Sequence, residues 1–528
     1  MNTPAASLAS IPLSVLDTDT LRQVAVDQGV CCRPVLRRVT DRATGQVTTV
    51  PIPCGSTRAS ICPTCATKAA RLRMTQCREG WHLTDEPPTP EPADHDTDDT
   101  ENTDEGTDAD GVGDRRVRST RRRQDAPDLP RVPMDAATVG KTFTAPDGAT
   151  YRPSMFVTLT LPGYGRIARG LGVPVDPSTY DYRQAALDAL HFPKLVDRWV
   201  QNLRRCAGYS VQYFGAVEAQ RRLAPHLHIA LRGAVPRATL RAVTAATYVQ
   251  LWWPSHTDDD VVYTSADDYP VFDRASGRYV DPATGEALTT WGEALDALDA
   301  DPNATPAHVV RFGAQVDIKG LLGGTPDSDR AVRYLCKYLT KDIASTYTDD
   351  PDDDAGVDPA YAAHIDRLHT ETRWLPCSPS CANWLRYGIE PADPGPGLIP
   401  GRCPSKAHDR ETLGLGGRRC LVSRRWSGKT LAQHKADRAT VVRAALEAAG
   451  IDAPNARRMA ADELTPDGTP RFVWENVPLD ARDYATAIAE SIAQTTQWRH
   501  QYEHAKALLN PPEPPPNGPV DSHSATAA

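Results

Sequence analysis

The sequence has no long apolar run, and none approaches the roughly 18 residues that a membrane-spanning helix needs. Residues 1–16 contain no basic side chain ahead of their mildly apolar stretch, so the pattern of a secretion signal is also missing. Since nothing marks the chain for export, disulfides are not expected among its 12 cysteines, and metal binding becomes the leading explanation for those that cluster. We expect a cytoplasmic protein without a membrane partner.

A complete phosphate-binding loop is missing as well. Residues 427–430 read Ser-Gly-Lys-Thr, but Ser423 stands where the Walker A motif needs a glycine, and no apolar strand directly precedes the segment. We therefore reject nucleotide hydrolysis. The surrounding basic stretch, residues 416–430, has an aromatic residue in its midst, a composition typical of nucleic-acid surfaces.

Negative charge is unevenly distributed along the chain. The net charge is −9, yet the acidic residues concentrate in residues 86–114 and 349–358, while basic residues surround the motifs described below. A length of 528 residues suggests roughly three or four domains. The expected organisation is a zinc-ribbon-like module over residues 1–84, a disordered linker over 85–133, a catalytic domain over 134–348 with an insertion at 258–306, a second zinc module with the basic segment over 349–430, a helical region over 431–510 and a disordered tail over 511–528.

A first group of cysteines lies near the beginning of the chain. Cys62 and Cys65 form a Cys-x-x-Cys knuckle, and Cys54 with one of the pair Cys31 and Cys32 completes four thiolates, enough for a closed tetrahedral zinc site. We favour Cys32 as the first ligand. A redox role for this knuckle requires a thioredoxin-like βαβ context, which the segment lacks, so structural zinc is the preferred interpretation.

A second group of metal-binding side chains follows later. Cys377 and Cys381 have Cys-x₃-Cys spacing, and Cys403 and His408 have Cys-x₄-His spacing. These ligand types and spacings suit a second structural zinc, with Cys420 as a substitute ligand.

Hydrophobic periodicity places the secondary-structure elements. Alternating or β-branched apolar runs predict strands at 155–161, 213–218, 226–231 and 308–318. Helical spacing predicts helices at 194–206 with Pro193 in the first turn, 237–253, 331–342, 431–449 and 481–509. The insertion at 258–306 contains no motif that predicts a function.

Two histidines share one face of a predicted strand. Period 2 puts His226 and His228 on the same side, where two imidazoles can share one divalent ion. A hairpin or short loop brings Glu218 near them, and two histidines plus a carboxylate leave positions open for substrate and water, as Mg²⁺ or Mn²⁺ catalysis requires. The alternatives are a chance histidine pair on a half-exposed strand and a surface glutamate paired with Arg221 or Arg222.

Two tyrosines lie four residues apart in a predicted helix. Tyr334 and Tyr338 occupy one helix face, and Lys337 and Lys341 each follow a tyrosine by three residues. A tyrosinate can attack a phosphodiester while an ammonium offsets charge on the phosphate. A structural amphipathic helix with tyrosines at the edge of the core has the same spacing, and the spacing alone favours that interpretation.

In sequence order, a Thr-Leu-Thr strand at residues 158–160, the His-x-His strand and the Tyr-x-x-Lys helix resemble the motifs of the HUH endonuclease superfamily. The chain is most similar to replication initiator proteins of actinobacterial plasmids and integrative conjugative elements, over residues 156–341 and with cysteine-bearing flanks of the same character. It departs from the superfamily in the long distance between the second and third motifs. The resemblance implies an α+β fold with a central antiparallel sheet and flanking helices.

The resemblance also implies roles for individual residues. It places a catalytic divalent ion on His226, His228 and, less directly, Glu218. It makes Tyr338 the first nucleophile and leaves Tyr334 for the second transfer.

The implied activity is that of a site-specific DNA nickase and strand transferase that starts rolling-circle replication. A single-stranded or hairpin segment of a double-strand origin is cut through a tyrosyl-DNA intermediate, and the free 3′-hydroxyl serves the host polymerase. Candidate partners beyond origin DNA are a host helicase, the polymerase and a second copy of the chain in a homodimer. Two alternatives stay open: a conjugative relaxase or transposase of the same superfamily, and a non-catalytic zinc-dependent DNA-binding regulator.

Overall fold

The computed structural model describes residues 17–83, 85–87, 126–337, 339–340, 358–416, 419–437, 464–477 and 481–509. The chain divides into two units: unit 1 combines Met1–Ala69 with Leu431–Ala528, and unit 2 is Ala70–Thr430. Several expected features lie outside the described residues: Tyr338, Lys341, nearly all of the linker, most of the helix at 431–449 and the tail. In the part of the chain that is described, no helix is both long and apolar enough to cross a membrane.

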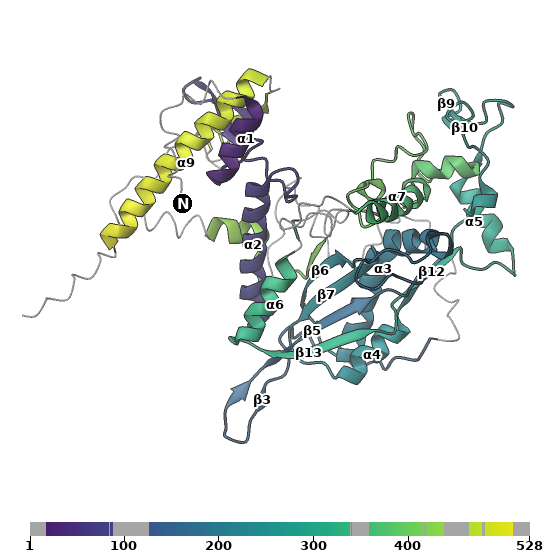
Figure 1. Ribbon diagram of the computed structural model, residues 1–528, viewed down its shortest axis with the longest axis horizontal. Helices are drawn as coiled ribbons and strands as arrows, with labels where there is room; N and C mark the ends of the chain where they lie inside the picture. Colours follow the sequence, from purple (N-terminus) through teal and green to yellow (C-terminus); the bar gives the residue numbers. More distant parts are fainter. Residues whose placement is uncertain are drawn as a thin grey trace, which may run out of the picture. The chain divides into compact units, whose positions relative to one another are not determined.

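Unit 1 is built from segments near both ends of the sequence. Its elements are α1 (Thr18–Asp27), β1 (Val35–Asp41), β2 (Val47–Ile52), the beginning of α2 (Pro63–Trp81), β16 (Phe472–Asn476) and α9 (Ala481–Leu509). The strands form an antiparallel sheet in the order β16-β1-β2, and α9 lies along α1 and β2 (Figure 1). Ile488 and Ile492 of α9 are buried against Leu21 and Ala25 of α1. The helix predicted at 481–509 is therefore confirmed, and its apolar stripe faces this core.

Unit 2 contains a five-stranded antiparallel sheet in the order β13-β5-β7-β6-β15. The strands are β5 (Pro153–Thr160), β6 (Tyr213–Ala219), β7 (Pro225–Leu231), β13 (Val316–Leu322) and β15 (Cys420–Val422). The structure thus confirms a mixture of helices and antiparallel strands, with strands close to those predicted at 155–161, 213–218 and 226–231. Short pairs accompany this sheet: β3 (Phe143–Thr144) with β4 (Thr150–Tyr151), and β8 (Tyr248–Leu251) with β12 (His308–Arg311).

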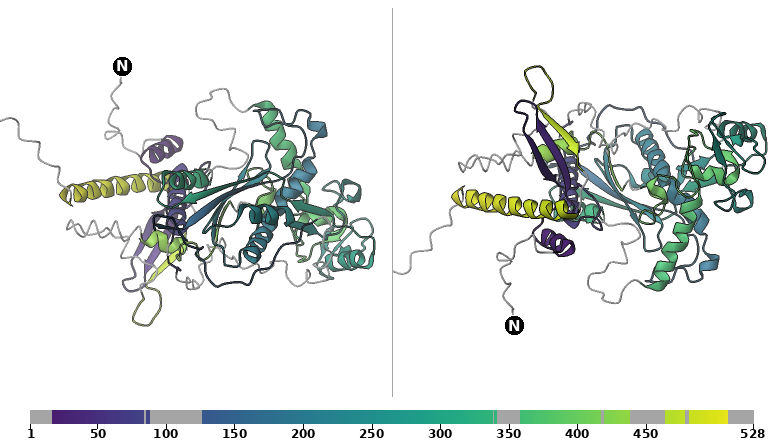
Figure 2. Two further views of the ribbon diagram at one scale, coloured as in Figure 1. Left: turned by 90° about the horizontal axis from the view of Figure 1, so that it is seen from below. Right: turned by 90° about the horizontal axis from the view of Figure 1, so that it is seen from above.

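Both faces of the large sheet are buried, because alternate side chains enter different cores. Leu159, Leu227 and Ile229 pack in the larger core with α3 (Tyr182–Ala207) and α7 (Pro359–Trp374). Their neighbours Phe156, Phe214, Ala216 and Ala230 face a second cluster that includes Val332 and Leu335 of α6 (Pro326–Lys337) and Trp81 at the end of α2. Figures 1 and 2 show the sheet between these helices. The predicted histidine strand therefore has a helix over each face.

The insertion at 258–306 folds together with the second cysteine segment. It contributes β9 (Val271–Asp273), β10 (Arg278–Val280), β11 (Thr289–Thr290) and α5 (Trp291–Ala300). Strand β11 pairs in parallel with β14 (Ile389–Glu390), and Trp291 packs with Trp253, Cys381 and Trp384. The insertion, which has no recognisable motif, therefore packs against the segment that carries the second cysteine group.

Four predicted elements were wrong in extent. The helix expected at 331–342 begins earlier, as α6, and the described residues 339–340 after it are in a turn. The helix expected at 194–206 begins at Tyr182, because Asp181 caps it by accepting a hydrogen bond from the Gln184 amide, and Pro193 lies inside it. The helix expected at 237–253 ends as α4 (Arg237–Ala246), and the chain continues as β8. The strand expected at 308–318 is two strands.

Gly313 explains the division of that strand. Its amide donates to the Thr160 carbonyl, and a Cβ there would lie 3.0 Å from the Leu161 carbonyl oxygen. The chain therefore leaves β12, which pairs with β8, and joins β5 as β13.

Candidate metal centre

Three neighbouring strands bring the candidate ligands together on one face of the sheet. Glu218 of β6 lies directly opposite His226 of β7, and Thr158 of β5 lies opposite His228. The turn between β6 and β7 is tight, so the carboxylate expected from sequence reaches both histidines. All four side chains are on the face that α6 covers. Each lies an even number of residues from Phe156, Phe214 or Ala230 on its own strand, and these three residues face the cluster that includes α6.

The three candidate ligands converge within metal-binding distance. One ligand atom from each of Glu218, His226 and His228 lies within 4.8 Å of the other two. The Nε2 atoms of His226 and His228 are 3.6 Å and 3.7 Å from Oε2 of Glu218, and the two imidazole centroids are 4.3 Å apart. The suggested alternative of a surface glutamate paired with arginine is wrong, because Glu218 is only 2% exposed. Arg222 instead donates to the carbonyls of Leu161 and Pro162.

Burial sets the charge state of this group. It lowers the pKa of His226 and of His228 to about 4, so both imidazoles are neutral at pH 7 and keep a lone pair for a metal. Burial also raises the pKa of Glu218 to about 7, against the opposing effect of positive neighbours that include Lys337. A carboxylate this deeply buried is stabilised in its charged form by a cation beside it.

Unsatisfied polar atoms support metal binding at the same place. Within the described residues, Oε1 of Glu218 and both ring nitrogens of His226 are buried without a hydrogen-bond partner. Such atoms are costly unless something binds them. Two neutral imidazoles and one carboxylate form a donor set that fits a divalent ion with open positions. That this ion is Mg²⁺ or Mn²⁺ stays a prediction.

Thr158 orients one of the imidazoles. Its Oγ1 lies 2.9 Å from Nδ1 of His228, on the far side of the ring from Glu218. If Nδ1 carries the proton and donates to this hydroxyl, the lone pair of Nε2 faces the carboxylate. The sequence shows that threonines occupy alternate positions of this strand. That Thr158 contacts His228 becomes visible only from the pairing of β5 with β7.

A tyrosine of α6 completes the arrangement. The hydroxyl of Tyr334 lies 3.2 Å from Nε2 of His228, and the rings meet edge to face with centroids 4.8 Å apart. Tyr334 as a residue is 41% exposed. Lys337, one turn further on, ends the described part of this helix. Tyr338 and Lys341 lie outside the described residues.

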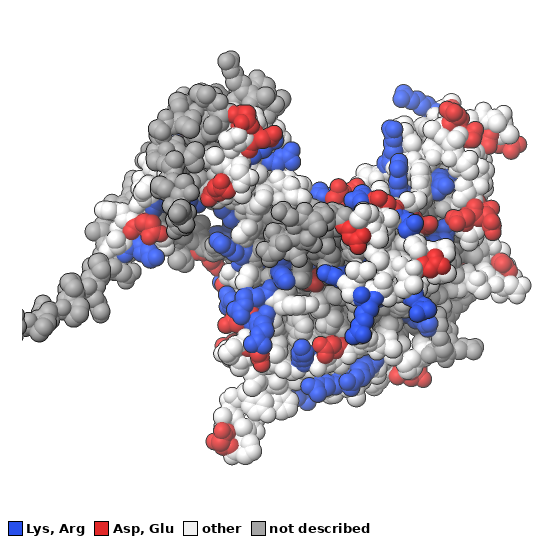
Figure 3. All heavy atoms as spheres, in the orientation of Figure 1, with Lys and Arg blue, Asp and Glu red and all other residues white. Residues whose placement is uncertain are grey.

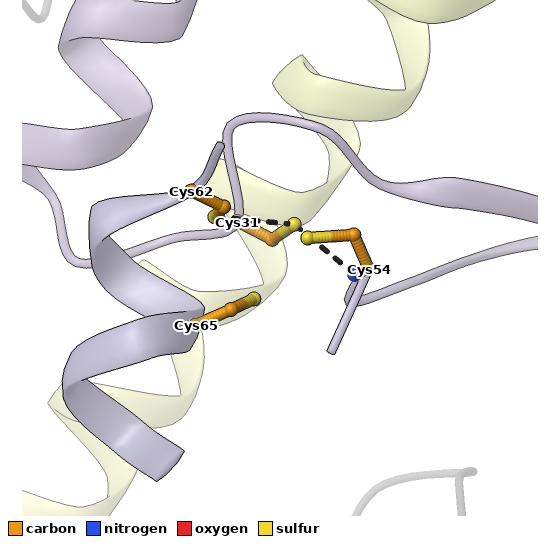
Figure 4. Close-up of side chains that lie close together, drawn as sticks. All are labelled: Cys31, Cys54, Cys62 and Cys65. Atoms are coloured by element: carbon orange, nitrogen blue, oxygen red, sulfur yellow. Dashed lines mark hydrogen bonds between the residues drawn. The ribbon is translucent and has the colours of Figure 1, made fainter. Parts of the chain in front are cut away.

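The sulfur atoms of the first cysteine group lie close together in unit 1. The sulfur atoms of Cys31, Cys54, Cys62 and Cys65 all lie within 4.8 Å of one another (Figure 4). Those of Cys31 and Cys62 are 3.8 Å apart, which equals the edge of about 3.8 Å in a tetrahedron with zinc–sulfur bonds of roughly 2.3 Å. The Cys65 thiol beside it lowers the pKa of Cys31 to about 5, which favours the thiolate that binds zinc.

The structure brings Cys31, not the expected Cys32, into this group. The amide of Cys54 donates to the Cys31 sulfur at 3.3 Å, which draws that sulfur to the other ligands. The sulfur of Cys32 points to the carbonyl of Ile61 at 3.9 Å. The sequence could not separate the two, because adjacent residues have the same spacing to the remaining cysteines.

The second group contains the four residues expected from sequence, Cys377, Cys381, Cys403 and His408, and their ligand atoms also lie within 4.8 Å of one another. The sulfurs of Cys377 and Cys403 are 4.0 Å apart, and Nε2 of His408 is 3.5 Å from the sulfur of Cys381. Nδ1 of His408 lies 2.7 Å from the carbonyl oxygen of Thr372, which directs Nε2 to the cysteines. Both groups, Cys₄ and Cys₃His, could hold zinc. The proposed substitute Cys420 lies in β15, opposite Ala216.

Comparison with known proteins gives one match. The model of a protein family described as "RepSA: Replication initiator protein, pSAM2" matches residues 17–497. The searches of curated proteins and of solved structures gave no match.

Proposed function

This chain belongs to the RepSA family of replication initiator proteins, and from that premise we propose that it nicks and rejoins one DNA strand at a double-strand origin to start rolling-circle replication. Such an initiator binds DNA at an origin. The likeness of its motifs to HUH endonucleases and the antiparallel sheet with its candidate metal-binding face support the chemistry. The proposal includes a cytoplasmic location, an element of the plasmid or integrative conjugative type and two structural zinc ions.

In the proposed reaction, a tyrosine hydroxyl attacks one phosphorus atom of the origin strand. The phenolic oxygen forms the new bond, the phosphorus–O3′ bond breaks, and the released 3′ oxygen takes up a proton in place of the one the phenol loses. A divalent ion held by Glu218, His226 and His228 would supply Lewis-acid polarisation of that phosphate. The 5′-phosphotyrosyl link conserves the bond energy for the later rejoining step, so no nucleotide cofactor is needed.

The contact of Tyr334 with His228 carries this proposal. Tyr334 as a whole residue is 41% exposed, and its hydroxyl lies 3.2 Å from a candidate metal ligand, where it can reach a phosphate at the ion. A tyrosine whose only role was to pack in the hydrophobic core would be buried. The resemblance assigns Tyr338 the first attack and Tyr334 the second transfer, and we keep that division as part of the proposal.

Positive charge around the site suits a DNA strand. Exposed cations on α6 and on the neighbouring β13 include Arg330, Arg333, Lys337 and Lys319. Arg330 lies 3.3 Å from Asp327 and Lys319 lies 3.9 Å from Asp317, and Figure 3 shows Lys and Arg together with Asp and Glu over this region. Arg333 and Lys337, one residue before and three residues after Tyr334, are therefore the cations that we expect to contact a DNA phosphate there.

The test uses a labelled single-stranded oligonucleotide from the origin of the element that encodes the protein, with Mn²⁺, resolved on a denaturing gel. We expect a metal-dependent covalent adduct with the wild type and a loss of at least roughly 100-fold in Tyr338→Phe, because Tyr338 is the proposed first nucleophile and Tyr334 is assigned to the second transfer. Tyr334→Phe should form the adduct but fail to rejoin the strand. Tyr151→Phe, a similarly exposed tyrosine of β4, is the matched control.

The outcomes separate the alternatives. If Tyr334→Phe alone abolishes the adduct, the order of the two tyrosines is the reverse of that proposed. If tight binding occurs without an adduct on any origin strand, the proposed nickase is wrong and a non-catalytic zinc-dependent DNA-binding regulator takes its place.

A further inference from the structure

A polar pocket opens next to the metal-binding face, at the end of β5. Its volume is about 310 Å³, and three segments form its walls: residues 160–163, Gln220 with Arg222, and residues 313–315. Thr160 lies directly opposite His226 and on the same face of the sheet, so the pocket adjoins the candidate ligands. None of the expected catalytic or metal-binding residues lines it.

The walls of the pocket are held in place before any ligand binds. The guanidinium of Arg222 donates to the carbonyls of Pro162 and Leu161 at 2.6 Å and 2.7 Å, which ties the turn between β6 and β7 to the end of β5. The carbonyl of Arg222 accepts a hydrogen bond from Tyr180. Leu223, buried in the same turn, has a φ of 63°, a conformation that costs a branched residue free energy. Strain of this kind persists where surrounding contacts fix a functional shape.

The chemistry of the walls suits a nucleobase. The side chains include the amides of Gln220 and Gln315, the hydroxyl of Thr160 and one guanidinium, and the described residues that line the pocket include no carboxylate. A side-chain amide can donate to and accept from a base edge at the same time. Because Oε1 of Gln220 accepts a hydrogen bond from Nε of Arg222 at 2.7 Å, Gln220 offers a base its NH₂ group, and Gln315 is the amide that can both donate and accept. The hydroxyl of Thr160 donates to the backbone carbonyl of Gln315, which fixes that backbone at the pocket mouth.

A second hollow continues from this pocket. It has a volume of about 290 Å³, shares Gln220 and Arg222 with the first, and adds Arg169 and Arg221. Guanidinium groups are the preferred partners of phosphates. The order of features along this surface is therefore metal ligands, amide-bearing pocket and arginines.

We propose that this pocket binds one unpaired base of the DNA strand that is cut, next to the scissile phosphate, while the adjoining phosphodiester lies along Arg169 and Arg221. This inference rests on the proposed nickase function and adds a site of sequence recognition to it. A base can enter only when it is unstacked and unpaired, so the pocket selects a single-stranded or extruded origin segment.

The experiment measures binding of fluorescent single-stranded origin oligonucleotides by anisotropy, in buffer without chelator or added divalent ion and with the zinc content of each protein verified, so that no cleavage is expected. Each oligonucleotide carries one abasic site at a different position around the nick. For the wild type, one abasic position should raise Kd by roughly ten-fold, the range for loss of a well-made amide–base contact. Gln315→Ala should raise Kd for the intact strand by a similar factor. In this variant the abasic site at that position should cause no further rise in Kd, because the base and the Gln315 amide belong to the same contact.

Two further variants complete the design. Ala314→Trp fills the pocket from an exposed position and should reproduce Gln315→Ala. Gln201→Ala, an exposed glutamine of α3, should behave as the wild type. Adduct formation with Mn²⁺ is measured in parallel. If wild type forms the adduct but the effects of the abasic site and of Gln315→Ala add independently, the pocket proposal is wrong and the nickase stands. If no strand yields an adduct, the nickase proposal and the pocket proposal are both wrong.

Discussion

Replacing Thr158 by valine removes one hydroxyl from the ring of contacts around the candidate metal centre. Valine has the same shape, so packing in β5 is preserved and the change is confined to the partner of His228 Nδ1, now 2.9 Å away. His228 is 4% exposed, so water does not readily replace the lost hydroxyl. The imidazole would be left with a buried N–H that has no acceptor whenever Nε2 binds a metal.

The expected cost follows from that geometry. An unpaired buried donor costs about 1–3 kcal/mol. Loss of the group that orients a histidine ligand weakens metal binding about 10–100-fold, which corresponds to roughly 1.4–2.7 kcal/mol. We therefore expect Thr158→Val to bind Mn²⁺ with a Kd roughly 10–100-fold above that of the wild type, whereas Thr158→Ser, which keeps the hydroxyl, should remain close to it.

Isothermal titration with Mn²⁺, on protein whose zinc content has been verified, measures this change. Thr244→Val is the matched control, because its buried hydroxyl also accepts a hydrogen bond from a ring nitrogen, Nε1 of Trp199 at 3.0 Å, and this contact involves none of the candidate metal ligands. An unchanged Kd in Thr158→Val, or an equal loss in Thr244→Val, would refute the role given to Thr158.

Two further predictions concern zinc and acid stability. By mass spectrometry, Cys31→Ser should lose one of two zinc ions and Cys32→Ser neither; loss in Cys32→Ser alone would contradict the observed cysteine group. Burial lowers the pKa of His364 from 6.5 to about 4, so as pH falls through this window the unfolded state takes up the proton first and stability is lost. In urea titrations, the stability lost between pH 7 and pH 5 should be about 2 kcal/mol smaller in His364→Gln, and an equal loss would refute this assignment.

The candidate metal ligands were largely visible in the sequence because their spacing is local. His226 and His228 are two residues apart on one strand, and the hairpin that adds Glu218 is short. The second cysteine group likewise needs only the spacing of Cys-x₃-Cys and Cys-x₄-His. Where local spacing was degenerate, as for Cys31 and Cys32, the sequence could not decide, since the choice depends on the Cys54 amide.

Features that depend on distant pairing were not accessible to the same reasoning. Helical periodicity continued past Ala246 into residues that pair with β12, because a short apolar run does not distinguish a helix from a strand. The partner of Thr158 and the pocket beside Thr160 exist only once β5 lies against β7. The segment that forms β16 carried no signal that it joins β1.

The pairing of β16 with β1 has a consequence for the order in which the chain can fold. Asp41 and Arg471, which bind each other at 2.9 Å, are 430 residues apart, and all of unit 2 is synthesised between them. Unit 2 can therefore fold on the ribosome before β16, the pairing partner of β1, has been synthesised. A product that ends shortly after Thr430 keeps every residue of unit 2 but leaves β1 as an open edge, which is the kind of strand that recruits other chains into aggregates.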